Sequence, residues 1–184
     1  TQEELRIECE ALDRLIEQGQ VLLDNEQDRK FQQLRLLVNT IRTEHPEDKI
    51  IIFTEFTDTL KFLERELTKD NFLITKITGG LSPEEKKQNA IIFEKRADIL
   101  LGTEAAGEGL NLQFANIAIN YELPWNPNRL EQRIGRVYRY RQKKEVYIYN
   151  FKTAFPIDEA VLRKILEKME NIRAIYGSNT IDVI

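Results

Sequence analysis

The chain has 184 residues and a formal charge of −4, which is enough length for one domain with an extension or for two small domains. It holds one histidine, His45, and one cysteine, Cys9, which argues against a zinc site, an internal disulfide and a Ser-His or Cys-His nucleophile pair. No apolar run of about eighteen residues and no charged, apolar leader occurs, so we expect neither a membrane span nor a signal peptide.

The hydrophobic pattern changes once, at about residue 46. Before that point apolar residues recur at helical spacing, and beyond it short β-branched runs alternate with amphipathic stretches, which is typical of βαβ units. In chain order we expect helices over residues 1–25, 28–44, 57–67, 82–93, 127–136 and 158–175, and strands over residues 49–53, 72–77, 98–101, 115–121 and 145–150. We predict an α/β fold of three layers, α/β/α, with a mostly parallel sheet of about five to six strands. A helical extension (1–45) precedes this domain (46–184).

Short polar residues and glycines follow the predicted strands, among them Thr54, Gly80, Ser82 and Thr103. Parallel strands end at one edge of a sheet, and ligands bind at that edge in open α/β folds. Hydroxyls and backbone amides there can approach a phosphate. Ordinary turn chemistry explains any one of these loops, but together they favour an edge that faces phosphate.

Seven basic residues and one acid, Glu131, lie between Arg129 and Lys144. Arg133, Arg136 and Arg139 recur every three residues, which places them on one face of a helix. Guanidinium groups suit phosphate because they donate paired, charge-assisted hydrogen bonds. A solvated basic helix face is the alternative interpretation.

Five sequence blocks decide between these interpretations, because their order and spacing resemble the second RecA-like lobe of superfamily-two helicases. The resemblance covers residues 28 to about 170. Among these helicases, the blocks are most similar to the Swi/Snf-type ATPases, and within those to the RapA-like bacterial and archaeal group. The blocks are residues 50–58, 77–82, 103–112, 122–127 (with W-N-P) and 132–142 (with Q-R-x-x-R-x-x-R). The glycine loop in the third block is neither a Rossmann fingerprint nor a P-loop.

The resemblance implies that ATP binds between two lobes, with the P-loop and the Mg²⁺ site on a first lobe that this chain does not contain. We therefore expect this chain to be inactive as an ATPase alone, and to hold no metal itself. The resemblance implies that Arg136 and Arg139 are catalytic arginine fingers. It assigns cofactor binding to Gln132, Arg133, Gly107, Glu108, Gly109 and Asn111, with Gln132 and Arg133 orienting the helix or sensing nucleotide.

The resemblance also implies contacts with the nucleic-acid backbone, from Thr54, Gly80, Ser82, Thr103 and Trp125. A buried aromatic at a strand end is the alternative for Trp125.

The chain departs from the family pattern at four positions, Ala106, Glu122, Tyr138 and Arg141. Arg141 replaces a common glycine, adds charge and restricts the backbone, so we assign no role to the neighbouring Gln142. We interpret Arg129, Lys143 and Lys144 as solvated charge.

The sequence thus predicts the second lobe of an ATP-dependent DNA translocase. The expected partners are the first lobe of the same parent protein, double-stranded DNA and a protein target of remodelling, in the cytoplasm at a bacterial or archaeal nucleoid. Two alternatives stay open: a non-catalytic module that binds nucleic acid or docks a partner, and a lobe of an RNA helicase. The W-N-P and G-E-G-L-N-L blocks favour the Swi/Snf type over RNA helicases.

Overall fold

The structure is a computed structural model, and it divides the chain into two compact units, Thr1–Glu44 and His45–Ile184. The residues that it describes are 6, 8–14, 29–103, 110, 112–124, 126–138, 144–151, 163–164, 167 and 181–183. No helix in these ranges is long and apolar enough to cross a membrane.

The first unit is helical wherever it is described. Residues 6 and 8–14 are in helical conformation, and α2 (Arg29–Glu44) follows. The side chains of Phe31, Leu34, Val38 and Ile41 are buried, at the three- and four-residue spacing that predicted this helix. Both predicted N-terminal helices therefore agree with the described residues.

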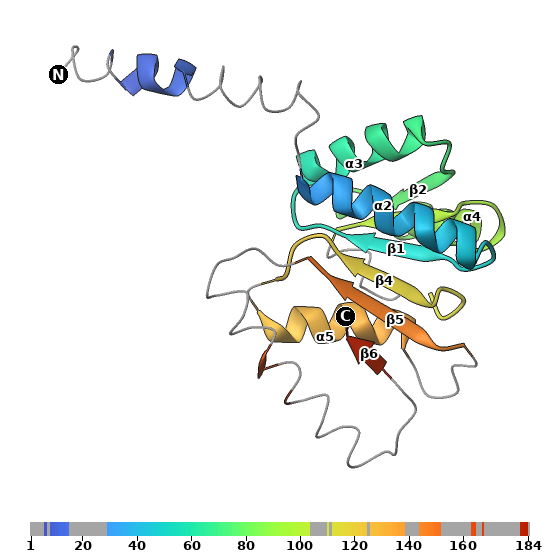
Figure 1. Cartoon of the computed structure of the whole chain (residues 1–184). Coiled ribbons are helices and arrows are strands. Elements are labelled where there is room, and N and C mark those ends of the chain that lie inside the picture. The colour runs from blue at the N-terminus through green and yellow to red at the C-terminus, as the bar shows by residue number, and fades with distance from the viewer. Residues whose placement is uncertain are drawn as a thin grey trace. The chain divides into compact units, whose positions relative to one another are not determined.

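The second unit is built on a six-stranded sheet whose strands run parallel in the order β2-β3-β1-β4-β5-β6. Figure 1 shows β1, β4, β5 and β6 following one another down the sheet. The strands are β1 (Ile50–Phe53), β2 (Ile74–Ile77), β3 (Ile99–Gly102), β4 (Ile117–Asn120), β5 (Val146–Asn150) and β6 (Ile181–Val183). Every residue of β1, β3 and β4 is buried, as their continuous apolar runs predicted. The sequence pattern did not predict β6.

Helices cover both faces of this sheet, which confirms the α/β prediction. The helices are α3 (Thr57–Lys69), α4 (Pro83–Lys95) and α5 (Pro127–Val137). Side chains of α4 and α5 share one core cluster with Ile51 and Phe53 of β1. The buried leucines of α3 lie outside that cluster, and right-handed crossovers place α3 on the opposite face. Residues 163, 164 and 167, within the predicted closing helix, are helical.

The start of α4 follows the predicted capping pattern. Ser82 Oγ accepts a hydrogen bond from Glu85 N (3.2 Å), and Glu85 Oε2 accepts one from Ser82 N (2.8 Å). Pro83 occupies the first helical turn, where its missing N–H leaves no intrahelical bond unmade. Hydrogen bonding from the Ser82 backbone N–H, and then from the Ser82 side chain, lowers the pKa of the Glu85 carboxyl.

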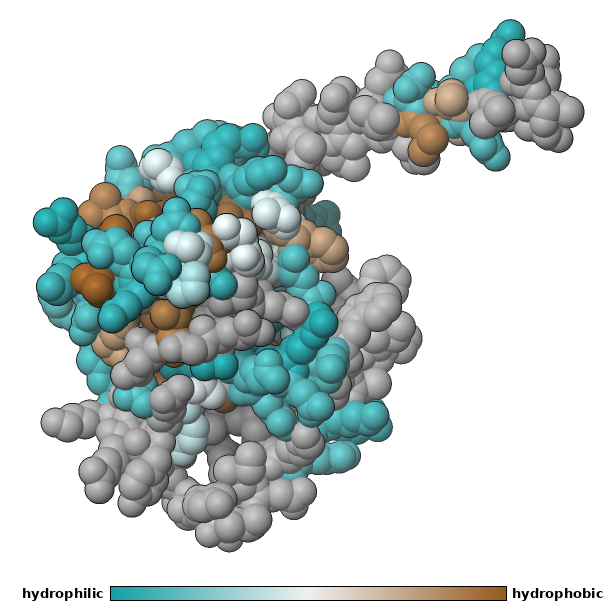
Figure 2. Space-filling model, turned by 180° about the vertical axis from the view of Figure 1, so that it is seen from behind, coloured by the Kyte–Doolittle hydropathy of each residue, from teal (hydrophilic) through white to brown (hydrophobic). Residues whose placement is uncertain are grey.

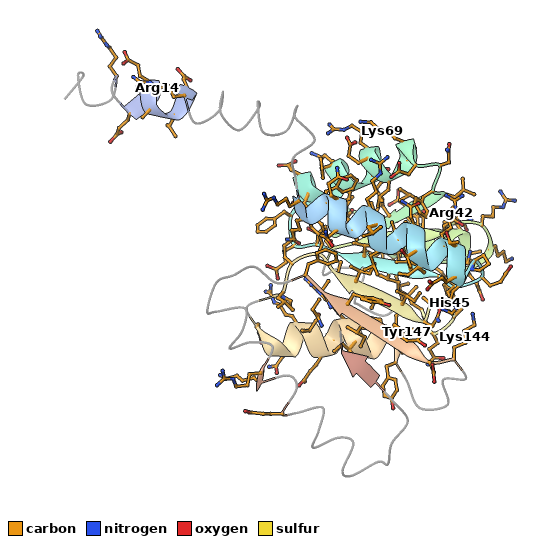
Figure 3. All side chains as sticks on the ribbon, in the orientation of Figure 1. Arg14, Arg42, His45, Lys69, Lys144 and Tyr147 are labelled. Carbon is orange, nitrogen blue, oxygen red and sulfur yellow. The ribbon has the colours of Figure 1, made fainter. Side chains whose placement is uncertain are left out.

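A second polar cluster, the amino-edge clasp of Asp48, Asn116 and Lys144, ties together the entries to β1, β4 and β5. Asp48 accepts hydrogen bonds from Lys144 Nζ (2.7 Å) and Asn116 Nδ2 (2.8 Å). Lys144 lies with His45 and Tyr147 at this end of the sheet (Figure 3). Lys144 is exposed, which agrees with its interpretation as solvated charge, and it also anchors the clasp through this ion pair.

The amino-edge clasp makes the free energy of unfolding depend on pH in the acid range, because it contains the ionised carboxyl of Asp48. Burial alone would raise the pKa of Asp48, but the hydrogen bonds from Lys144 and Asn116 and the nearby charge of Lys144 bring it below its ordinary value of 3.8. Because the folded state favours the ionised carboxyl, this stabilisation is full above the unfolded pKa and is lost as the pH falls through the folded pKa.

We predict that Asp48→Asn lowers the free energy of unfolding by about 2 kcal/mol at pH 7. Urea titrations at pH 7 and pH 3 measure it, and the difference from wild type should shrink at the lower pH. Glu94→Gln, an exposed change on α4, is the control and should stay within about 0.5 kcal/mol of wild type. A deficit of equal size at both pH values would contradict the role of the Asp48 charge.

Candidate functional site

The carboxyl ends of the central strands lie level with one another. Phe53 of β1 pairs with Gly102 of β3 and with Asn120 of β4, and Asn120 pairs in turn with Asn150 of β5. The ladder continues one residue beyond the strands, since Thr54 N donates to Gly102 O (3.0 Å). The loops after these strands therefore share one edge, the carboxyl edge, where ligands bind in open α/β sheets.

The half of this edge nearest β2 carries hydroxyl groups and a glycine. Thr54 is fully buried, and its Oγ1 accepts a hydrogen bond from Phe56 N (3.3 Å). Thr103 is half-buried, and its N donates to Ile77 O (3.2 Å). Gly80 is exposed, and a side chain at this position would meet no atom within 4 Å. Among the residues predicted to contact nucleic acid in this half of the edge, Gly80 and Ser82 are thus the ones exposed to solvent.

The half nearest β4 is charged and centres on Arg133, which points inward from α5 and is 3% exposed. Its Nη1 donates to Asn120 Oδ1 and to Glu122 O, both at 3.1 Å. Its Nη2 lies 3.7 Å from Glu55 Oε1, and its Cζ lies 5.5 Å from the centre of the Phe53 ring. A buried cation is stabilised by such acceptors, by the ion pair and by the aromatic face.

Two carboxylates stand beside this buried guanidinium. Glu55 Oε1 also forms an ion pair with Arg129 Nη1 at 3.8 Å, and Glu122 Oε2 accepts a hydrogen bond from Glu55 N at 3.3 Å. The loop after β1 is therefore joined both to α5 and to the loop after β4. Arg129 is exposed, which agrees with its interpretation as solvated charge, and it also has an ion-pair partner in this structure.

The network reaches one strand further, because Asn120 Nδ2 donates to Asn150 Oδ1 (2.9 Å). Glu55, Asn120 and Asn150 were absent from the predicted site. A polar residue that ends an otherwise apolar strand is a signal that finds Asn120 and Asn150, since a buried amide needs partners. No comparable signal in the sequence marks Glu55.

Helix α5 separates apolar from polar side chains around its axis. Leu130, Ile134 and Val137 are buried in the core cluster. At 100° per residue, the side chains of the opposite flank gather within about a third of a turn: Arg129, Gln132, Arg133 and Arg136. Gln132 is exposed and Arg136 is half-buried, one helical turn further along.

Several predicted site residues lie outside the described part of the chain, so their placement stays a prediction: Arg139, Gly107, Glu108, Gly109, Asn111 and Trp125. In the described ranges, the structure brings Arg133, Arg136 and Gln132 onto one side of α5 and sets Thr54 and Thr103 on neighbouring strand ends.

Comparisons with known proteins agree on one family. Residues 29–141 match the family described as "Helicase conserved C-terminal domain". The ATP-dependent helicase YqhH of Bacillus subtilis is 41% identical over 131 residues, which are 71% of this chain and 24% of YqhH. The "ATP-dependent DNA helicase DDM1" of Arabidopsis thaliana is 30% identical over 153 residues, 80% of this chain and 20% of DDM1.

The crystal structure of the C-terminal part of the Fun30 ATPase domain is similar in three dimensions. The TM-score is 0.68 at 28% identity, and the match covers 74% of this chain and 45% of that one. This chain spans about a quarter or less of the length of YqhH and DDM1.

We predict that Arg133→Met and Arg129→Met differ strongly in stability, although both arginines pair with the same carboxylate. Arg133→Met should lower the free energy of unfolding by about 3 kcal/mol, because it leaves the buried Asn120 Oδ1 and the Glu122 carbonyl without their donor and removes the buried partner of Glu55. Arg129→Met should cost less than about 1 kcal/mol, because that pair is half exposed to water. Denaturant titrations measure both, and similar losses would show that Arg133 is not the centre of the network.

Proposed function

Because this chain belongs to the family of helicase conserved C-terminal domains, with Swi/Snf-type ATP-dependent helicases among its relatives, we propose that it is the second ATPase lobe of a DNA translocase of that type. The predicted resemblance and the RecA-like fold are confirmed by the same findings. The observation that carries the proposal is the arginine-bearing flank of α5 beside the carboxyl edge of a parallel sheet.

The described residues of α5 fit a nucleotide phosphate. Gln132, which is exposed, and Arg136, which is half-buried, lie four residues apart on one flank, and an arginine with an amide suits phosphate oxygens. Arg133 is engaged with protein groups in the interior. Its part in this proposal is to position α5, which was one of its two expected roles.

ATP, when bound, would supply a phosphoryl group whose equatorial oxygens gain charge during transfer. Arg136 would donate paired hydrogen bonds to those oxygens, and Arg139 would add a second guanidinium. Gln132 would hold the nucleotide near them. The rigid connection of Arg133 to two strand ends would keep α5 from turning as Arg136 binds, so little reorganisation is needed at the moment of transfer.

The hydroxyl half of the carboxyl edge would hold the nucleic acid. Neutral hydroxyls and backbone amides contact phosphates without reading sequence, which suits a motor that moves along DNA of any sequence. Closure of two lobes on ATP, each gripping the strand, would advance the protein along the duplex. Such a motor would act in the cytoplasm, at a bacterial or archaeal nucleoid, on DNA-bound proteins.

A first lobe in the parent protein would supply the P-loop and the acidic residues that hold Mg²⁺, since the sequence has no G-x-x-x-x-G-K-[ST] motif. The isolated chain would then be inactive as an ATPase. In this arrangement the first lobe would supply the P-loop and the Mg²⁺ site, and this chain would supply the arginines that stabilise the transition state.

We predict that duplex DNA stimulates ATP hydrolysis by the full-length parent protein more than RNA of the same length does. Steady-state turnover, measured against nucleic-acid concentration at several salt concentrations, tests the choice of nucleic acid. The isolated 184-residue chain is the control and should hydrolyse no ATP under any of these conditions. Stimulation by RNA alone would identify an RNA helicase, and an absence of hydrolysis would favour a module that only binds.

We predict that Arg136→Ala or Arg139→Ala in the full-length parent lowers turnover by about 10³-fold or more, because an arginine finger stabilises the transferring phosphoryl group. Duplex binding, measured by fluorescence anisotropy, should persist in both variants. Arg96→Ala, an exposed change at the end of α4, is the matched control and should retain turnover. Near-normal turnover in either finger variant would remove that arginine from the mechanism.

A further inference from the structure

One carboxylate at the carboxyl edge serves two arginines that differ in exposure. Glu55 Oε1 lies 3.7 Å from Arg133 Nη2 and 3.8 Å from Arg129 Nη1. The Arg133 side chain is 3% exposed, whereas the Arg129 side chain is 50% exposed. We propose that Arg129 binds the phosphate backbone of DNA, that Glu55 holds Arg129 at this edge until the DNA arrives, and that Phe56 in the loop after β1 adds an apolar contact with the same DNA. This inference rests on the proposed function and names a binding site within it.

The surroundings of Glu55 allow Arg129 to move from this carboxylate to a DNA phosphate at little cost in free energy. Glu55 is shared between two guanidinium groups, at 3.7 Å from Arg133 Nη2 and 3.8 Å from Arg129 Nη1. Arg133 is fixed by two other acceptors, Asn120 Oδ1 and Glu122 O. If Arg129 turns from Glu55 to a phosphate, Glu55 still faces Arg133, and no carboxylate is left buried without a cation.

The ion pair between Arg129 and Glu55 is also expected to be weaker than the buried pair between Arg133 and Glu55. Half-exposed ion pairs contribute little to stability because water screens them, whereas an arginine–phosphate contact releases counterions from the DNA. Arg129 is therefore placed to exchange Glu55 for a DNA phosphate, whereas the buried Arg133 is placed to keep its protein partners.

Phe56 supplies an apolar surface next to the same carboxylate. It follows Glu55 directly, precedes the first turn of α3 and is 60% exposed, while its backbone N is held by Thr54 Oγ1. Because the bases of a duplex are already stacked on one another, an exposed aromatic side chain in this loop would contact the sugars of the backbone, while Arg129 contacts a phosphate. Leu73 is as exposed, at 61%, but it lies before β2 at the other end of the sheet.

The hydrophobic residues in view in Figure 2 lie in small groups among hydrophilic ones. Exposed apolar side chains are common on proteins, so exposure of Phe56 alone indicates nothing. Its place beside Glu55 is the informative feature.

Arg129 would serve a different phosphate from the one that Arg136 serves. The two residues are seven positions apart on α5, which corresponds to about 10 Å along the helix axis. Arg129 lies in the first turn, beside the β1 loop that carries Thr54, and Arg136 lies in the last turn. We therefore assign Arg129 to the nucleic acid and leave the nucleotide to Arg136.

The experiment compares variants of the full-length parent by the duplex concentration that gives half-maximal stimulation of ATP hydrolysis, at several salt concentrations. Arg129→Gln should raise this concentration about three- to tenfold and should lower the salt slope by about one, because one phosphate contact is lost. Phe56→Ala should raise it severalfold with the salt slope intact, because an apolar contact with the sugars releases no counterions. Glu55→Gln should lower it, because the competing carboxylate is gone.

Two matched controls stand on α3 and before β2. Arg65→Gln removes an arginine that is 64% exposed and ion-paired to Glu66, and Leu73→Ala removes the equally exposed apolar side chain. Both variants should keep the wild-type duplex concentration for half-maximal stimulation and the wild-type salt slope. Thermal unfolding of every variant separates a lost contact from a damaged fold.

The proposal would be overturned if Arg129→Gln kept the wild-type duplex concentration for half-maximal stimulation and the wild-type salt slope. A larger change in the KM for ATP than in this duplex concentration would also overturn it, since that result would make Arg129 a nucleotide ligand. An equal loss in Leu73→Ala would remove Phe56 from the site. If duplex DNA does not stimulate the wild-type protein, the proposed function fails first, whereas stimulation with an unaffected Arg129→Gln variant defeats this inference alone.

Discussion

The carboxyl edge of this protein depends on the buried guanidinium of Arg133. A charge that is 3% exposed is stable only when several groups compensate for the water it has lost, and here they come from β1, β4 and the loops behind them. Because these groups belong to separate segments, the requirement to satisfy one cation fixes the orientation of α5 against the strand ends. The helix that carries the proposed catalytic arginine is thereby held by an arginine that is not itself accessible.

The sheet is fastened at both ends, and the two fastenings differ in kind. At the amino edge, Asp48 joins Lys144 and Asn116, so the charge balances within the clasp and the interaction stabilises the fold. At the carboxyl edge, two arginines share the carboxylate of Glu55, and only one of the two, Arg129, is exposed. An anion that approaches this edge therefore meets a cation that is already held in place.

The geometry also relates the two proposed ligands. Thr54, Gly80, Ser82 and Thr103, proposed for nucleic acid, follow β1, β2 and β3, whereas α5 carries Arg129 for nucleic acid and Gln132 and Arg136 for nucleotide. Glu55 connects the loop after β1 with α5. A shift of α5 must therefore carry the loop after β1 with it or break the contacts of Arg133. In a motor, such a connection would let the nucleotide state alter the grip on DNA through two ion pairs and one hydrogen bond rather than through a long chain of contacts.

The alternation of buried β-branched runs with amphipathic helices determined the parallel sheet, and Ser82-Pro83 with Glu85 determined the start of α4, because these depend on local pattern and capping. The arginine repeat and the blocks around it identified the family. Tertiary structure alone decided which arginine is buried, because Arg129, Arg133 and Arg136 are alike in sequence and differ only in the depth at which α5 places them. It also decided that Glu55 pairs with residues more than seventy positions away and that Lys144 meets Asp48, contacts between distant segments that no local pattern encodes.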